Sequence, residues 1–116
     1  MEYTEPKDVT SPQTSVSNVR PILDGGEWEY SLALLNWDDE PALGIRWNGG
    51  MQVSRQGKKK QHPGNPQSRG LPIWFILPPN LILPVLKALK NELGGESIDK
   101  KLAEKQVLEE IKRLEG

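Results

Sequence analysis

A basic and aromatic segment in the middle of the chain holds the residue types best suited to binding chemistry. Between Gly44 and Phe75 the sequence has six Lys or Arg residues, three aromatic residues and no Asp or Glu. Cationic side chains bind phosphate groups, and flat aromatic rings stack on unpaired bases. The segment therefore predicts a surface for single-stranded nucleic acid. Its most concentrated charges are Arg55, Lys58, Lys59 and Lys60.

Charge is segregated along the chain, although the formal net charge is only −1. Residues 1–40 hold nine acids and two bases, residues 41–91 hold eight bases and no acid, and residues 92–116 hold seven acids and five bases. An ordinary solvated surface intersperses the two signs. The acid-free stretch predicts a positive face with an anionic partner, and the alternative is a basic loop without a partner.

Aromatic residues lie on the strands that flank this basic stretch. Along a strand from Trp28 to Trp37, alternation divides the side chains between two faces. One face holds Trp28, Tyr30, Leu32 and Leu34, and the other holds Ser31, Ala33, Leu35 and Trp37. On the next strand, Arg46 and Trp47 point to opposite faces. We expect Trp37 and Arg46 to face the ligand, and we expect Trp28 and Trp47 to be interior residues.

The remaining pattern is typical of an antiparallel meander, because turn residues separate short apolar runs from Asn18 onwards. Asn48-Gly49 predicts a type I′ hairpin turn, since both residues tolerate positive φ. A last strand is expected over about residues 71–77. Residues 54–69 contain no Ala, Val, Leu or Ile and predict a long solvated loop. Residues 1–19 are rich in Ser, Thr and Pro and predict a disordered tail.

Two amphipathic helices are expected after the last strand. The first carries Ile82, Val85, Leu86, Leu89 and Leu93 at helical spacing and ends at a Gly-Gly pair. The second, over about residues 97–114, has a thin apolar stripe. One sheet with one helix cannot bury both sheet faces, so we expect a homodimer. Its predicted interface consists of Val85, Leu86, Leu89 and Leu93.

The sequence argues against an enzyme. It has no Cys and a single histidine, His62, which leaves no catalytic triad and no metal cluster. The stretch from Gly50 to Lys58 lacks the spacing of a phosphate-binding loop. The carboxylates from Asp38 to Glu40 would suit a divalent-metal nuclease, but a turn points three consecutive side chains in different directions, and a solvated turn is the simpler interpretation. No catalytic residue, metal or cofactor is expected.

Length and composition predict one small domain over residues 20–95, followed by a C-terminal helix over residues 96–116. No run of 18 apolar residues is present, and the N-terminus lacks the pattern of a signal peptide. We therefore expect a soluble, cytoplasmic protein without membrane contact. The C-terminal helix leaves an alternative function open, in which the chain is a protein-interaction module or a regulator of transcription that binds through this helix.

The residues also resemble a known family. The stretch EWEYSLALLNWDDEPALGIRWNGG, the basic loop, RGLPIWFILPP and the leucine-rich helix are similar to the single-stranded DNA-binding transcriptional coactivators of the positive cofactor four type, including short bacterial and phage relatives. The resemblance covers about residues 27–93. It implies an α+β fold in which a curved four-stranded antiparallel sheet precedes one helix, and in which two subunits dimerise through their helices to form basic grooves for two single strands.

The resemblance also assigns roles to single residues. It implies that Trp37 is the groove aromatic, that Arg46 is the strand arginine and that residues 55–60 form the flexible basic loop. Arg69 matches a basic residue that the family places immediately before the last strand, although here it lies further upstream. The implied function is non-enzymatic binding of DNA opened in replication, recombination or transcription. The implied setting is the cytoplasm of a bacterium or of a phage-infected cell, with proteins of those processes as further partners.

Overall fold

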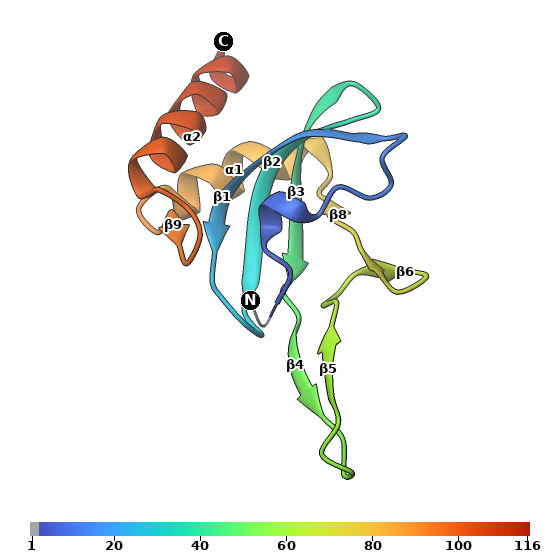
Figure 1. Cartoon of the computed structure of the whole chain (residues 1–116). Helices are drawn as coiled ribbons and strands as arrows, with labels where there is room; N and C mark the ends of the chain where they lie inside the picture. The colour runs from blue at the N-terminus through green and yellow to red at the C-terminus, as the bar shows by residue number, and fades with distance from the viewer. Residues whose placement is uncertain (1–2) are drawn as a thin grey trace.

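The chain folds into a mixed β-sheet and two α-helices, and the computed structural model describes residues 3–116 (Figure 1). The expected α+β class is thereby confirmed. In chain order, the elements are the 3-10 helix η1 (Pro6–Asp8), β1 (Val16–Asp24), β2 (Tyr30–Trp37), β3 (Glu40–Trp47), β4 (Gly50–Val53), β5 (Lys59–His62), β6 (Gln67–Ser68), β7 (Leu71–Pro72), β8 (Phe75–Ile76), α1 (Pro79–Leu89), β9 (Gly94–Gly95) and α2 (Lys100–Glu115).

The main sheet has five strands in the order β8-β3-β2-β1-β9. The first four pair antiparallel, and the short β9 runs parallel to β1. The tight turn between β2 and β3 is Asp38-Asp39, where φ is +50° and +67°, as a type I′ turn requires. The separate prediction of a type I′ turn at Asn48-Gly49, after β3, is wrong. Neither residue has positive φ, and the buried side chain of Asn48 donates to the carbonyl oxygen of Gly26 (2.7 Å).

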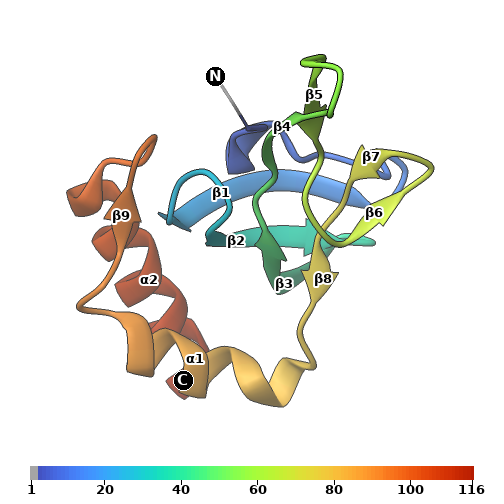
Figure 2. The same ribbon diagram turned by 90° about the horizontal axis from the view of Figure 1, so that it is seen from below.

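One face of the main sheet packs against both helices (Figure 2). Inward-facing leucines of β2 and β3 meet the apolar stripe of α1, and α2 packs beside α1. Full burial of one such aliphatic side chain contributes about 1.5–3 kcal/mol. The predicted alternation of β2 is confirmed for this face. The cluster consists of Ile22, Leu32, Leu34, Leu43, Ile82, Leu86, Leu93, Ala103 and Val107.

The opposite face of the sheet is covered by the segment that precedes β1. Val9 is fully buried over Ala33 and Leu35, and its carbonyl oxygen accepts a hydrogen bond from Trp74 Nε1 (2.8 Å). This corrects the predicted disordered tail for residues 3–19, because a few apolar side chains suffice to hold a polar segment over a sheet face that is otherwise bare. Residues 1–2 lie outside the described part of the chain.

The apolar stripe of α1 is used within a single chain. Leu86 and Leu93 are buried, and Val85 and Leu89 pack at the margin of the same cluster. The expectation of a dimer rested on a sheet face without cover, and the N-terminal segment covers that face. Leu86 and Leu93 are therefore core residues of the single chain, whereas the predicted dimer interface of Val85, Leu86, Leu89 and Leu93 stays a prediction.

Strands β4 and β5 form a separate two-stranded hairpin that projects from the body of the molecule (Figure 1). We call residues 50–62 the arm. Its register pairs Gly50 with His62 and Val53 with Lys59. The predicted loop over residues 54–69 is thus partly strand, because main-chain hydrogen bonds order it without aliphatic side chains. The predicted last strand over residues 71–77 is divided into β7 and β8, which belong to different sheets.

A buried carboxylate joins segments that are far apart in the sequence. Asp24 is 1% exposed and accepts hydrogen bonds from Tyr3 Oη (2.8 Å), Ser97 Oγ (2.7 Å) and Asn48 Nδ2 (3.2 Å). Burial, together with the hydrogen bond to Asp24, raises the pKa of Tyr3 above its ordinary value. Asp24 therefore links the N-terminal segment, the end of β3 and the residues that precede α2.

Candidate nucleic-acid interface

The arm presents concentrated positive charge to solvent. Arg55, Lys58, Lys59 and Lys60 are all exposed. The three ion pairs within residues 3–116 lie elsewhere, beside η1 and on α1 and α2. These four cations therefore face solvent without a carboxylate partner in the described part of the chain, which is an arrangement suited to a polyanion.

The base of the arm, which we call its foot, is the pairing of Trp47 with Asn65, and it fixes the arm to the end of β3. Trp47 N donates to Asn65 O (2.7 Å), and Asn65 N donates to Trp47 O (3.0 Å). Gly64 has a φ of +82°, and a Cβ atom at this position would overlap the carbonyl oxygen of Trp47. A larger residue is therefore disfavoured at Gly64 both by its backbone conformation and by lack of space. The arm leaves the sheet in a defined direction for these reasons.

Trp28 supports the foot of the arm from another side. It lies in the turn before β2 with a φ of +63°, and its N–H donates to Gly49 O (3.0 Å). Trp28 is 47% exposed, and its ring lies against that of His62, with ring centroids 5.8 Å apart. The prediction that Trp28 is an interior residue is wrong, because β2 begins only at Tyr30 and its alternation does not extend to residue 28.

Arg46 is buried beneath the segment that returns from the arm to the sheet. It is 2% exposed, and its terminal guanidinium nitrogens donate to the carbonyl oxygens of Pro63, Pro66 (3.2 Å) and Ile73 (2.5 Å). Burial lowers the pKa of Arg46 to about 10, so the side chain remains charged at neutral pH. Arg46 is therefore not an exposed cation, and its predicted contact with a ligand stays a prediction. Its donors hold residues 63–73 against β3.

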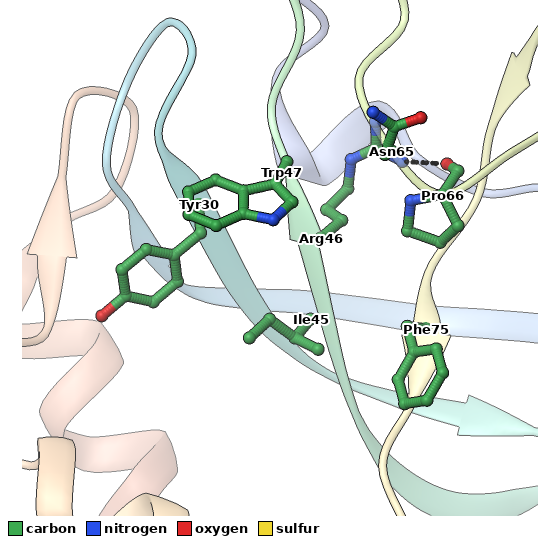
Figure 3. Close-up of a pocket in the computed structure, with 7 residues that line it drawn as sticks. All are labelled: Tyr30, Ile45, Arg46, Trp47, Asn65, Pro66 and Phe75. Atoms are coloured by element: carbon green, nitrogen blue, oxygen red, sulfur yellow. Dashed lines mark hydrogen bonds between the residues drawn. The ribbon is translucent and has the colours of Figure 1, made fainter.

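A pocket of about 520 Å³ opens at the foot of the arm, next to β3 and β8 (Figure 3). Its wall is mostly apolar and aromatic. The rings of Tyr30 and Trp47 meet edge to face, with centroids 6.0 Å apart and an interplanar angle of 77°. Trp47 and Phe75 are each 56% exposed, so both offer ring surface to a ligand. The lining residues are Tyr30, Ile45, Arg46, Trp47, Asn65, Pro66 and Phe75.

The exposure of Trp47 contradicts the prediction that it is an interior residue. It shares a sheet face with Leu43, as expected, but Leu43 packs under the helices and Trp47 does not. Leu43 belongs to the helix-side cluster, Ile45 packs at its margin and Trp47 lies outside it, so the helices cover only part of β3. Sequence reasoning missed Trp47 and Phe75 as binding candidates, and alternation along β3 carries no signal for the exposure of Trp47.

Trp37 lies at the far end of β2 from the arm. It lies seven positions after Tyr30, which corresponds to about 23 Å along the strand. Trp37 is half-buried, and it lines a second pocket of about 590 Å³ together with Arg69, which is exposed at the tip of the β6–β7 hairpin. The structure thus brings Trp37 and Arg69 together but leaves them apart from the cations of the arm.

The apolar stripe of α2 is occupied within the chain. Ala103 and Val107 are fully buried, and Ile111 and Leu114 pack at the margin of the helix-side cluster. The exposed leucines that remain on this helix are Leu102 and Leu108. The apolar stripe of α2 is therefore not free to bind another protein, as the alternative function of an interaction module would require.

Within residues 3–116, no three His, Cys, Asp or Glu side chains lie close enough together to bind one metal ion. The ring of His62 has a structural contact, since its Nδ1 accepts a hydrogen bond from Gly64 N (2.9 Å). In the same range, neither helix combines the length and the apolar character that are needed to cross a membrane.

Comparison with protein-family models, curated proteins and solved structures finds no match to this chain. The resemblance to the coactivators therefore rests on the sequence motifs alone. The geometry of the arm and of the pocket at its foot carries the functional argument.

Proposed function

We propose that the chain binds single-stranded nucleic acid, and specifically DNA, without cleaving it. The observation that carries the proposal is the joining of a cationic arm to exposed aromatic rings at its foot. The cations of the arm suit the phosphates of a strand, while Trp47 and Phe75 offer flat surfaces to unpaired bases. Each stacked base contributes about 1–3 kcal/mol in proteins of this kind. A duplex offers only base edges in its grooves, so these rings favour single strands.

The dimensions of the arm fit a short stretch of strand. Each strand of the arm has four residues, which corresponds to about 13 Å of extended chain. At about 3.4 Å per nucleotide of a stacked strand, this length accommodates about four nucleotides. Single-strand-binding modules have site sizes of about 4–16 nucleotides, so one arm and its foot are large enough for a complete site.

The resemblance to single-stranded DNA-binding coactivators supports the choice of DNA. With it we propose a cytoplasmic role on DNA opened in replication, recombination or transcription, together with proteins of those processes. A homodimer also remains part of the proposal, but its interface would use a surface other than the buried stripe of α1. Sedimentation at several protein concentrations measures the oligomeric state directly.

The test is a comparison of binding partners under one condition. Fluorescence anisotropy should be measured with labelled oligo-dT of about 20 nucleotides, oligo-U of equal length and the matching duplex, all at about 100 mM salt. We expect oligo-dT to bind more tightly than the duplex and to stay intact in the presence of Mg²⁺. Tighter binding of the duplex, or no binding of any of the three, would contradict the proposal.

A further inference from the structure

The pocket at the foot of the arm combines apolar walls with a buried positive charge. Its ring surface comes from Tyr30, Trp47 and Phe75, and its aliphatic surface from Ile45 and Pro66. Arg46 lies at this pocket with its charge buried, and the acceptors of its hydrogen bonds are neutral carbonyl oxygens. No ion pair within residues 3–116 involves Arg46. The pocket is therefore apolar on its surface and electropositive behind it.

These properties define the chemical class of ligand that fits. A phosphate would lose its hydration against the apolar walls without gaining a direct cationic contact, which is costly. A nucleobase is flat and uncharged, so it loses little hydration and gains stacking. Its carbonyl oxygens, such as thymine O4 or guanine O6, carry partial negative charge that a nearby guanidinium favours. An unpaired base is therefore a better match than any other part of a nucleic acid.

We propose that this pocket takes one unstacked base of a bound strand, packed against Trp47 and Phe75, while the arm holds the neighbouring phosphates. The inference rests on the proposed function and locates the base contact within it. The occupant is a nucleic-acid base and not an aromatic side chain of a protein partner, because four unpaired cations lie on the arm that begins at this pocket. Such a concentration of charge attracts a polyanion.

Arg46 acts in this site as a positioning residue, because it shapes the pocket through other groups. Its guanidinium holds the carbonyl oxygens of Pro63 and Pro66, which flank Asn65 in the pocket wall. It also holds the carbonyl oxygen of Ile73, two residues before Phe75. A lysine at this position lacks the planar fork that reaches several acceptors. Arg46→Lys should therefore loosen the pocket without changing the arm.

The experiment compares oligo-dT with an abasic oligomer of the same length and charge. Wild-type protein should bind oligo-dT about 5- to 150-fold more tightly, which is the range for one stacked base at about 1–3 kcal/mol. Trp47→Ala and Phe75→Ala should reduce this preference and leave the salt dependence of binding unchanged. Both side chains are more than half exposed, so these variants should fold. Trp37→Ala is the matched control, because it removes a tryptophan at the other end of the sheet and should keep the preference.

Two further measurements sharpen the test. Arg46→Lys, with its fold checked by circular dichroism, should lower the preference for oligo-dT over the abasic oligomer at an unchanged salt slope. Thymidine monophosphate should quench tryptophan fluorescence only at much higher concentration than oligo-dT, because it lacks neighbouring phosphates for the arm. Equal affinities for the mononucleotide and the strand would indicate a free-nucleotide site and would overturn the inference.

The failures of the two proposals are distinguishable. If the abasic oligomer binds as tightly as oligo-dT, the base pocket is refuted while single-strand binding through the arm stands. The same conclusion follows if Trp47→Ala and Phe75→Ala leave the preference intact, which would leave the pocket to a protein partner. If Trp37→Ala alone abolishes the preference, the base lies in the pocket shared by Trp37 and Arg69. If neither oligomer binds, the proposed function itself fails.

Discussion

Replacing Lys58, Lys59 and Lys60 together by alanine should flatten the salt dependence of single-strand binding. All three side chains are exposed, and the β4–β5 pairing uses main-chain groups, so the variant should keep its fold. Each phosphate contact contributes about 0.7 to the slope of log affinity against log salt for a single strand, so four arm cations contribute about 2.8 and Arg55 alone about 0.7. Between about 50 and 200 mM salt, the arm then accounts for a loss of about 50-fold in the wild type and about threefold in the variant.

The assay is fluorescence anisotropy with labelled oligo-dT at several salt concentrations. A matched control replaces Lys100, Lys101 and Lys105 by alanine, which removes the same charge from exposed positions on α2. The control should keep the wild-type slope. An unchanged slope in the arm variant would mean that the arm does not contact phosphates. An equal change in both variants would mean that net charge, and not the arm, governs binding.

Three predictions concern the fold that presents this site. Leu86→Ala should lower the free energy of unfolding, measured by urea denaturation, by about 2–5 kcal/mol. Leu108→Ala, on the exposed face of α2, should change it by about 0.5 kcal/mol or less. Similar values for both variants would contradict the core described here. Asp24→Asn should cost about 1–3 kcal/mol, because a neutral amide replaces the carboxylate that accepts from Tyr3 and Ser97, and a thermal midpoint equal to that of the wild type would show that this network is not needed. Val9→Asp should expose Trp74 and shift its fluorescence to longer wavelength, and an unshifted spectrum would mean that the N-terminal segment does not cover this face.

The secondary structure that depends on local pattern was predictable from the sequence. The alternation of β2 assigned Leu32 and Leu34 to one face and Ala33 and Leu35 to the other, and the two core clusters confirm this division. The stripe of α1 was also recognisable, because helical spacing is a local property. What these faces pack against depends on distant segments. Periodicity therefore predicted a buried stripe but not that the chain's own sheet and α2 would cover it.

The N-terminal segment shows why composition alone misleads. It is polar enough to predict disorder, yet Val9 and Tyr3 are buried and Trp74 holds the segment by a hydrogen bond. The apolar contacts that order it come from β2 and from a residue 65 positions further along the chain. No local signal reports such a contact, so its prediction would require knowledge of the sheet face that lacks a cover.

The candidate site was predictable in its chemistry and only partly in its residues. An acid-free stretch rich in Lys and Arg predicted exposed cations, and Arg55 to Lys60 are exposed. Arg46 belongs to the same stretch but is buried, because a guanidinium serves equally well as a donor to main-chain carbonyls. Residue type and charge do not distinguish these roles. The choice of Trp37 as the stacking ring stays a prediction, and the exposed ring of Trp47 was missed because alternation says which face a side chain occupies, not whether another element covers it.

The most direct measurement of the central claim is an NMR titration of isotope-labelled protein with oligo-dT, with main-chain amides and tryptophan side chains as probes. We predict that the largest shift changes will fall on residues 55–62, on Asn65 and Phe75, and on the indole N–H of Trp47. The indole signals of Trp37 and Trp74 should move little, because they lie far from the arm or are buried. Changes concentrated on α2 or around Trp37 and Arg69, with the arm and Trp47 unaffected, would contradict the account.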